Sequence, residues 1–413
     1  SLTDFQAELF VGFLSLFALP GCVLGSALAD ATGRRAGIGI AAALFLAGNV
    51  LMASAWSYTV LLTGRGIAGF AMGLTYVLAP LYVAEVSPSR LRGMLTSLLE
   101  VLSNVGILLG YTSGWACDGL PGSMDWRLML GLGVIPPLAI IVGTCCMMLE
   151  SPRWLAAQGR MDEAEEVLHR VVGPAEAKAA ILEMRSPDLG TAAAGSSAGF
   201  TEIVAAPGLL RTVFIGVGVA FFSQATGCEA VMYYSGSILE HAGISRGYML
   251  RATVLMGCVK TGAVLASGAL VDRWGRRPLL VLSSSGMCLS MLVLSAAGHW
   301  HWPPVTEVAA LCAFVVAFSA GFGPVVYVYN SEIYPQQFRS TGLGLAMGVC
   351  RVMSAVVSAT FLSLAHWLTT PGALVLYSGV AASAAIFVLT SVPETKGTTL
   401  ETSTSIFARG TSS

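Results

Sequence analysis

Eleven apolar stretches run through the chain, and at about 20 residues each is long enough to cross a lipid bilayer as a helix. Backbone polar groups inside a bilayer must be satisfied within the protein, which restricts such spans to helices. Only 11% of the 413 residues are charged, against about 25% in soluble proteins. The chain is therefore expected to be an all-α, multi-pass membrane protein. The stretches fall at 8–29, 37–56, 61–84, 95–116, 127–149, 211–235, 249–271, 278–298, 305–329, 341–367 and 372–392.

A short motif at the end of one apolar stretch occurs twice. The pattern Asp-x-x-Gly-Arg-Arg runs from Asp30 to Arg35 and again, 242 residues later, from Asp272 to Arg277. A second motif, a Glu with an Arg seven places on, is repeated at an offset of 247 residues. A duplicated membrane bundle with matching loop motifs is the plan of many transporters.

A polar insert after the fifth stretch separates the two copies. Within it, 161–172 has the pattern of an amphipathic helix, 174–184 indicates a second helix, and the Gly/Ala/Ser-rich 186–199 is typical of a flexible linker. The predicted organisation is an N-terminal bundle at 1–150, a cytoplasmic insert and linker at 151–205, a C-terminal bundle at 206–395 and a cytoplasmic tail at 396–413.

The basic residues of the short loops and of the insert fall on one side of the predicted spans. This side is expected to face the cytoplasm, because cytoplasmic loops carry an excess of Lys and Arg. Residues 1–6 then begin outside the cell. A chain that starts outside, lacks an initial Met and has an odd number of spans leads us to expect one further helix before Ser1.

The repeated motifs predict a charged gate at the inner helix ends. The Gly permits a tight turn, and the Asp can cap a helix N-terminus or pair with a neighbouring Arg. Ion pairs of this kind can form in one conformation and separate in another. The alternative is plain positive-inside charge. The candidate gate residues are Asp30, Arg34, Arg35, Glu85, Arg92, Glu150, Arg153, Asp272, Arg276, Arg277, Glu332 and Arg339.

Polar residues inside apolar spans are expensive in a bilayer, so each is a functional candidate. They are Asn104, Gln224, Glu229, Tyr233, Lys260 and Arg351. A hydroxylated ligand needs hydrogen-bond donors and acceptors for its hydroxyls, and an aromatic plane for its C–H face. Two alternatives stay open: Lys260 and Glu229 pair with each other for structure, and Arg351 is a packing cation bonded to backbone carbonyls.

Taken together, the motifs resemble those of the sugar porter family of the major facilitator superfamily, over essentially all of 1–400. The matching segments are Gly64-Arg65 with Gly69 and Gly73, Pro80 to Glu85, Glu150 to Leu155, Gln224 to Gly227 with Tyr233-Tyr234, and Pro393 to Gly397. The resemblance implies the major facilitator fold, with two pseudo-symmetric helical bundles and eleven of twelve transmembrane helices present. The absent first helix is the one that carries an acidic proton carrier in proton-coupled members.

Within this family the chain looks most like plant-type polyol/monosaccharide–proton symporters. By that resemblance the substrate-binding residues are Asn104, Ser223, Gln224, Glu229, Tyr233, Tyr234, Lys260, Tyr327 and Ser354. Several depart from the hexose pattern, since Ser223 stands for a Gln, Glu229 for an Asn and Tyr327 for a Trp. These departures favour a polyol, a cyclitol or an atypical monosaccharide over glucose. Tyr233 and Tyr234 serve either as a gate or in packing.

The expected function is secondary active transport of a polyol or monosaccharide by alternating access, coupled to protons. We expect no enzyme activity, no cofactor, no metal and no nucleic-acid partner, and the plasma membrane rather than an internal one. Two alternatives remain: a transporter-like sugar sensor or degenerate paralogue, and an organic-ion carrier of the same superfamily. Lys260, Glu229 and Arg351 are the residues that suggest the second of these.

Overall fold

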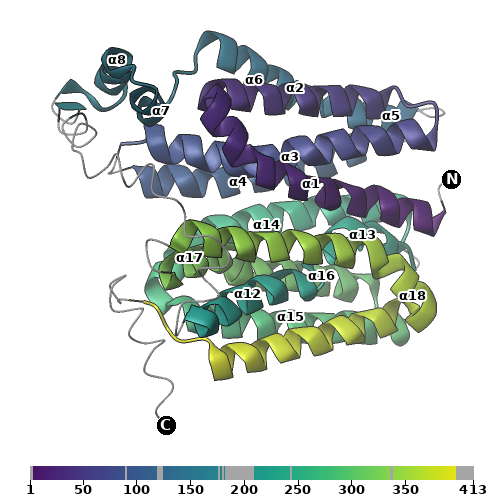
Figure 1. Ribbon diagram of the computed structural model, residues 1–413. Coiled ribbons are helices and arrows are strands. Elements are labelled where there is room, and N and C mark those ends of the chain that lie inside the picture. Colours follow the sequence, from purple (N-terminus) through teal and green to yellow (C-terminus); the bar gives the residue numbers. More distant parts are fainter. Residues whose placement is uncertain are drawn as a thin grey trace. The chain divides into compact units, whose positions relative to one another are not determined.

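The computed structural model describes residues 3–88, 91–118, 124–174, 177–178, 181, 209–241, 244–334 and 338–396. Within these residues the regular elements are α-helices and no strand occurs (Figure 1). The helices are α1 (Asp4–Thr32), α2 (Arg34–Ala53), α3 (Tyr58–Val86), α4 (Arg92–Ala116), α5 (Met124–Leu132), α6 (Ile135–Cys146), α7 (Pro152–Ala157), α8 (Met161–Val172), α12 (Leu209–Ala225), α13 (Cys228–His241), α14 (Arg246–Trp274), α15 (Arg276–His299), α16 (Pro304–Ala320), α17 (Phe322–Ile333) and α18 (Arg339–Ser391). The predicted linker at 186–199 lies outside the described residues.

Every predicted span coincides with helix, which confirms the all-α membrane class. Nine helical segments in the described part of the chain are long and apolar enough to cross a membrane. One of them, 341–391, holds two predicted spans, and Thr369 with a φ of 66° marks the point between them. The amphipathic pattern at 161–172 is α8, which buries Ala164, Val167 and Leu168.

Three predicted spans are broken helices, which the hydropathy pattern did not indicate. The span 127–149 is divided into α5 and α6, 211–235 into α12 and α13, and 305–329 into α16 and α17. Gly227, with a φ of 82°, forms the second break, and Gly321 forms the third. A Cβ on Gly227 would lie 2.9 Å from the Tyr377 ring, so this position requires a glycine for two reasons. Broken helices commonly form the substrate sites of transporters.

Contacts within the chain group the residues into two units. One, here called the N-terminal unit, comprises Phe13–Ser103 and Ala116–Ser196; the C-terminal unit comprises Ser1–Gly12, Asn104–Trp115 and Ser197–Ser413. The middle of the chain thus divides near the predicted linker. The boundaries that the sequence predicts at 150 and 206 remain a prediction.

Small residues hold α2 and α3 together in the N-terminal unit. A Cβ on Gly48 would lie 2.8 Å from the carbonyl oxygen of Gly64, and a Cβ on Gly64 would meet Gly48 and Met52 equally closely. The two backbones therefore touch, as small residues allow in membrane helices. Further along α3, Leu74 and Leu78 are fully buried in a cluster with Ala41 of α2.

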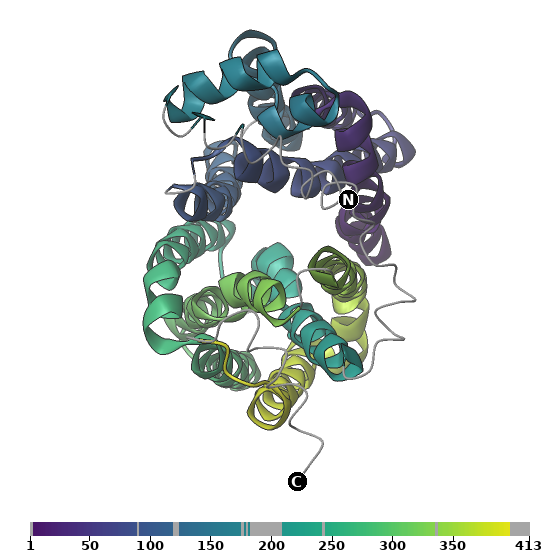
Figure 2. The same ribbon diagram turned by 60° about the vertical axis from the view of Figure 1, so that its left-hand side comes forward.

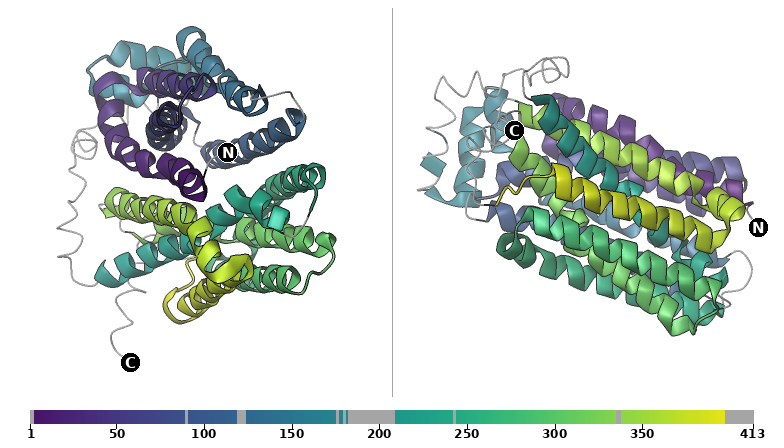
Figure 3. Two further views of the ribbon diagram at one scale, coloured as in Figure 1. Left: turned by 90° about the vertical axis from the view of Figure 1, so that its right-hand side faces the viewer. Right: turned by 90° about the horizontal axis from the view of Figure 1, so that it is seen from below.

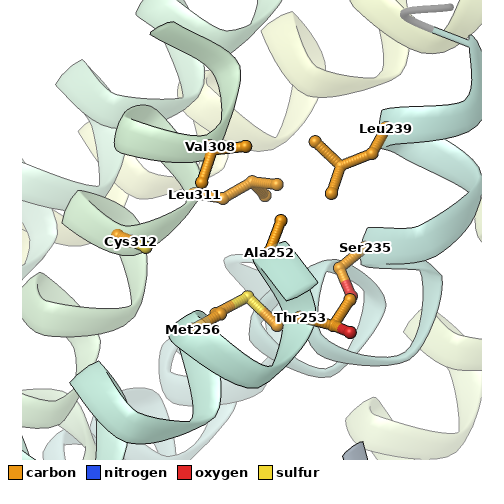
Figure 4. A pocket seen from close by; sticks show the side chains of 8 residues that line it. All are labelled: Ser235, Leu239, Ala252, Thr253, Met256, Val308, Leu311 and Cys312. Atoms are coloured by element: carbon orange, nitrogen blue, oxygen red, sulfur yellow. The ribbon is translucent and has the colours of Figure 1, made fainter. Parts of the chain in front are cut away.

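Large side chains fill the C-terminal unit. Tyr329, Phe314 and Met287 belong to one buried cluster shared by α12–α18. The ends of these helices are visible in Figure 2, and Figure 3 shows the last part of α18 running along α15. Figure 4 shows a part of this core where three helices pack together. Leu239 of α13, Met256 of α14 and Leu311 of α16 line a small gap between these helices. The space left there is too small for a water molecule.

Candidate functional site

An ion pair joins the start of α2 to the end of α3 in the N-terminal unit. Arg34 donates from Nε to Glu85 Oε2 at 2.8 Å and from Nη2 to Glu85 Oε1 at 2.9 Å. Both side chains are only 10% exposed, and Ser151 donates a further hydrogen bond to the same carboxylate. Such a two-point, poorly solvated pair is strong and geometrically specific.

A second carboxylate in this unit caps the N-terminus of α2. Glu150 Oε1 accepts from the backbone N–H groups of Arg34 at 2.8 Å, Arg35 at 3.1 Å and Ser151 at 2.9 Å. The unpaired N–H groups at a helix start favour an anion there. The motif Asp does not fill this position, since Asp30 is 74% exposed and its carboxylate lies 3.3 Å from Arg34 Nη1. We call Arg34, Glu85, Glu150 and Ser151 the N-terminal network.

The C-terminal unit contains the same arrangement. Arg276 Nη2 donates to Glu332 Oε1 at 2.7 Å, and Thr395 Oγ1 donates to Glu332 Oε2 at 2.7 Å. Glu394 accepts from the backbone N–H groups of Arg276 at 2.9 Å and Arg277 at 3.0 Å, so it caps α15. Arg276, Glu332, Glu394 and Thr395 form the C-terminal network, which matches the N-terminal network residue for residue.

The two turns before these helices have the same backbone conformation. Gly33 has φ 89° and ψ 166°, and Gly275 has φ 91° and ψ 172°. A Cβ at Gly33 would lie 2.5 Å from Glu150 Oε2, and one at Gly275 would lie 2.8 Å from Glu394 Oε2. Each turn thus needs a glycine both for its dihedral angles and for the carboxylate that caps the helix.

The second Arg of each motif binds backbone carbonyls. Arg35 Nε donates to Thr144 O at 2.6 Å, and Arg277 Nη2 donates to Leu389 O at 2.6 Å. Both therefore fasten the motif to the end of another helix in the same unit.

Arg153 is a predicted gate residue that stands outside both networks. Arg153 is exposed and forms no ion pair with a described residue. The side chains of Arg92, Asp272 and Arg339 lie outside the described part of the structure, so a contact of Glu85 with Arg92 stays untested.

Glu394 was missing from the predicted gate. The signal was present, because Glu394-Thr395 follows Glu150-Ser151 at an offset of 244 residues, close to the offsets of the two recognised motifs. A carboxylate followed by a hydroxyl residue is what both networks use.

A polar cluster surrounds the break between α12 and α13. Gln224 lies in the last turn of α12, Glu229 lies in the first turn of α13, and Arg351 and Ser354 approach from α18. We call Ser223, Gln224, Glu229, Arg351 and Ser354 the break cluster. Its members come from both sides of Gly227, and contacts to α18 are made by Ser223, which lies 3.5 Å from Cys350 Sγ, and by Glu229.

The break cluster holds a carboxylate and an amide with hydrogen-bonding capacity to spare. Ser354 donates to Glu229 Oε2, and Arg351 Nη1 lies 3.9 Å from Glu229 Oε1. Gln224 is 9% exposed, and its buried Oε1 accepts no hydrogen bond from the described residues. Ser223 Oγ donates to Ala220 O at 2.8 Å and lies 3.5 Å from Cys350 Sγ. Unsatisfied buried acceptors of this kind are costly unless a ligand or water supplies a donor.

Two of the alternatives left open by the sequence can be compared with the geometry. No ion pair joins Lys260 to Glu229, although both side chains are described; the partner of Glu229 is Arg351. Tyr234 is buried, donates to Ser358 O at 2.7 Å and stacks on Phe361, so it packs within the C-terminal unit.

The remaining candidates lie at the edge of this cluster or elsewhere in the C-terminal unit. Tyr233 and Tyr327 are nearly half exposed, and Asn104 is buried. Tyr111, one of the residues on the Asn104 face of α4, donates to Met232 O at 2.9 Å and so ties this part of α4 to α13. Lys260 lies on α14, a helix that contributes no residue to the break cluster.

Matched networks at equivalent helix junctions, together with broken apolar helices, define a multi-pass membrane carrier built from a repeat. The family described as "Sugar (and other) transporter" matches residues 2–407. The chain belongs to this family.

Relatives cover nearly the whole chain. Polyol transporter 5 of Arabidopsis thaliana is 37% identical over 431 residues, which include 98% of this chain and 80% of that protein. The D-xylose-proton symporter-like 3, chloroplastic, of the same plant is 36% identical over 413 residues, covering 95% of this chain and 73% of that protein.

Solved structures confirm the major facilitator fold. The inward-open xylose transporter XylE from E. coli has a TM-score of 0.84 at 26% identity, covering 97% of this chain and 89% of that one. The proton:xylose symporter XylE bound to 6-bromo-6-deoxy-D-glucose has a TM-score of 0.76 at 28% identity, covering 98% and 91%.

Proposed function

We propose that the protein carries a polyol or monosaccharide across a membrane by alternating access, coupled to protons. The observation that supports this most directly is the break cluster, where the amide of Gln224 and the carboxylate of Glu229 are held at a helix break. Hydroxyl groups of a substrate can donate to both. The names of the relatives, which include polyol transporters and a xylose–proton symporter-like protein, agree with this substrate class.

A neutral substrate fits the charge of the break cluster better than an organic ion does. The carboxylate of Glu229 lies beside the guanidinium of Arg351, so the pair is balanced without a charged ligand. A separation of 3.9 Å is longer than a hydrogen bond, which leaves acceptor capacity on the carboxylate for substrate hydroxyls. This favours transport of a hydroxylated neutral molecule over the organic-ion alternative.

A linear polyol or an atypical sugar suits the cluster better than a strict glucose site. Ser223 has a shorter side chain than the amide usual in the hexose pattern, and its hydroxyl is already bonded to Ala220 O. With fewer amide side chains at fixed positions, the site can accept substrates whose hydroxyl groups are arranged differently. The proposed substrate-binding residues are Asn104, Ser223, Gln224, Glu229, Tyr233, Lys260, Tyr327 and Ser354, with Gln224 and Glu229 as the main contacts. Tyr234 is left out of this set, because it packs on Phe361.

The two networks are proposed to act as the cytoplasmic gate. Each joins the end of one long helix to the start of another through a buried or half-buried pair, and each adds a carboxylate cap from a third segment. Several linked charges can bias an equilibrium between two conformations, where one exposed pair contributes only about 0–1 kcal/mol. Separation of these contacts would accompany opening of the inner side.

We also propose that transport is coupled to protons and that the protein lies in the plasma membrane. Coupling predicts that collapse of the proton gradient by a protonophore abolishes accumulation while equilibration continues. A fluorescent fusion distinguishes the plasma membrane from an organelle, such as the one indicated by the name of the chloroplastic relative.

Replacement of Gln224 by Ala tests the proposed substrate site. A lost hydrogen bond to a neutral hydroxyl is worth about 0.5–1.5 kcal/mol, so the apparent KM for labelled sorbitol is expected to rise by up to about tenfold. Inhibition of sorbitol uptake by inositol, xylose and glucose is expected to weaken in parallel. Carboxylates are expected to inhibit uptake by neither the unmodified protein nor the variant. Gln158→Ala, at an exposed position after α7, is the matched control and is expected to leave uptake unchanged. An unaltered KM in Gln224→Ala at normal surface expression would contradict the site.

A further inference from the structure

A second cavity lies in the C-terminal unit, at the helix ends opposite the C-terminal network. Its volume is about 620 Å³, within the range of small-molecule sites. Residues of α1, α13, α15, α16 and α18 line it, among them Tyr234, Leu294, Glu307 and Phe361. Arg276 of the C-terminal network is the first residue of α15. Gly298, which also lines the cavity, lies near the end of α15, so the full length of this helix separates the cavity from the network.

A buried carboxylate lines this cavity. Glu307 is 3% exposed and forms no hydrogen bond or ion pair with any described residue. It lies in the first turn of α16, where the helix dipole stabilises a negative charge. The imidazole of His301, in the turn before α16, is close enough to act electrostatically on this carboxylate. A buried carboxylate without a hydrogen-bonded partner is costly as an anion, and a cation bound beside it would offset this cost.

The rest of the lining adds aromatic and apolar surface and a second negative charge. The rings of Tyr234 and Phe361 stack with centroids 5.3 Å apart beside the cavity, and Leu294 and Leu374 provide apolar contacts. Glu240 is exposed at the cavity, and no Lys or Arg occurs among its described lining residues, where His366 is the basic side chain. Aromatic faces attract cations as well.

We propose that this cavity binds a small organic cation, with an ammonium group near Glu307 and an apolar or aromatic body against Tyr234 and Phe361. A metal ion fits less well, because the described residues contain no group of three or more metal-ligating side chains. A phosphate-bearing lipid headgroup is also unfavourable, because its phosphate would meet the carboxylates of Glu307 and Glu240. This site is separate from the break cluster, and its existence does not depend on the proposed transport of polyols.

Binding of benzyltrimethylammonium to the purified protein tests this proposal. The compound is expected to raise the melting temperature in a saturable way, while the neutral benzyl alcohol and the zwitterionic phosphocholine have little effect. Excess sorbitol is expected not to displace it. Equal binding of benzyl alcohol would show that the cavity is merely apolar and would overturn the proposal. Displacement of the cation by sorbitol would also overturn it, because the cation would then lie in the substrate site.

Variants at the carboxylate give the second arm of the test. Loss of a buried charge partner is expected to weaken binding at least about tenfold in Glu307→Gln, whereas Glu307→Asp retains most of it. Glu163→Gln, on the exposed face of α8, is the matched control with unchanged binding. If Glu307→Gln binds as tightly as the unmodified protein, the proposal is wrong. The comparison of ligands on the unmodified protein decides the question even if this variant does not fold.

Discussion

Substitution of Arg34 by Ala is expected to lower both the stability and the transport rate of the protein. Glu85, itself 10% exposed, would lose its two-point partner and keep only the hydrogen bond from Ser151. Breaking a buried pair by removing one partner costs about 3–5 kcal/mol, enough to shift a two-state equilibrium by tenfold or more. The melting temperature of the purified protein and the initial rate of uptake are the two measurements.

A matched control and a double variant make this prediction specific. Arg153→Ala removes an exposed Arg from the same side of the N-terminal unit and is expected to change neither quantity. In Arg34→Met/Glu85→Leu, no buried charge is left unpaired, so the melting temperature is expected to recover in part while uptake stays low. Wild-type uptake in Arg34→Ala would contradict a gating role. Recovery of uptake in the double variant would show that the pair serves stability alone.

Substitution of Gly33 by Ala is expected to have the second large effect. The turn has φ 89° and ψ 166°, a region that is essentially restricted to glycine and costs other residues about 1–3 kcal/mol. The new Cβ would also lie 2.5 Å from Glu150 Oε2 and displace the carboxylate that caps α2. Loss of a helix cap costs about 1 kcal/mol more. We expect a lower melting temperature and uptake reduced about tenfold or more.

Two glycine controls separate the causes. Gly159→Ala introduces strain at a φ of 77° with no atom within 4 Å of the new Cβ, and Gly268→Ala introduces neither strain nor contact. We expect Gly159→Ala to lower only the melting temperature and Gly268→Ala to change little. If Gly33→Ala resembles Gly159→Ala in both measurements, the cap contributes nothing to transport.

The sequence predicts the spans of this fold well because their signal is strong. An apolar run of about 20 residues has few other structures available to it. The charged motifs are also predictable, since Gly33 and Gly275 each precede a helix in a repeated pattern. In the repeat, Arg34 is equivalent to Arg276 and Glu85 is equivalent to Glu332. The Arg34–Glu85 contact therefore predicts the Arg276–Glu332 contact.

The broken helices and the choice of partners could not be predicted in the same way. The hydropathy pattern does not show the turn at Gly227, because Ser223, Gln224 and Glu229 interrupt a long apolar span only briefly and the φ of a single Gly leaves no periodic signal. The partner of Glu229 is set by how α18 packs against α13, which local sequence does not encode. Arg351, far away in the chain, is therefore the ion-pair partner of Glu229, a role that one of the open alternatives gave to Lys260.

Capping carboxylates belong to the same class of long-range features. Glu394 lies 118 residues after Arg276, the first residue of the helix that it caps, and its role depends on the return of the chain to this helix end. The buried Glu307 is absent from the predicted site for a local reason. It sits at the end of an apolar span, where an acidic residue is ordinarily assigned to the solvent-exposed loop.

Counterflow in proteoliposomes tests the central claim, carrier-mediated exchange of a hydroxylated substrate, most directly. Vesicles loaded with unlabelled sorbitol are placed in a trace of labelled sorbitol. We predict a transient accumulation of label above the external concentration, which disappears in protein-free vesicles and is strongly reduced in Arg34→Ala. Saturable binding of sorbitol without any exchange of label would contradict the account and would leave a sensor.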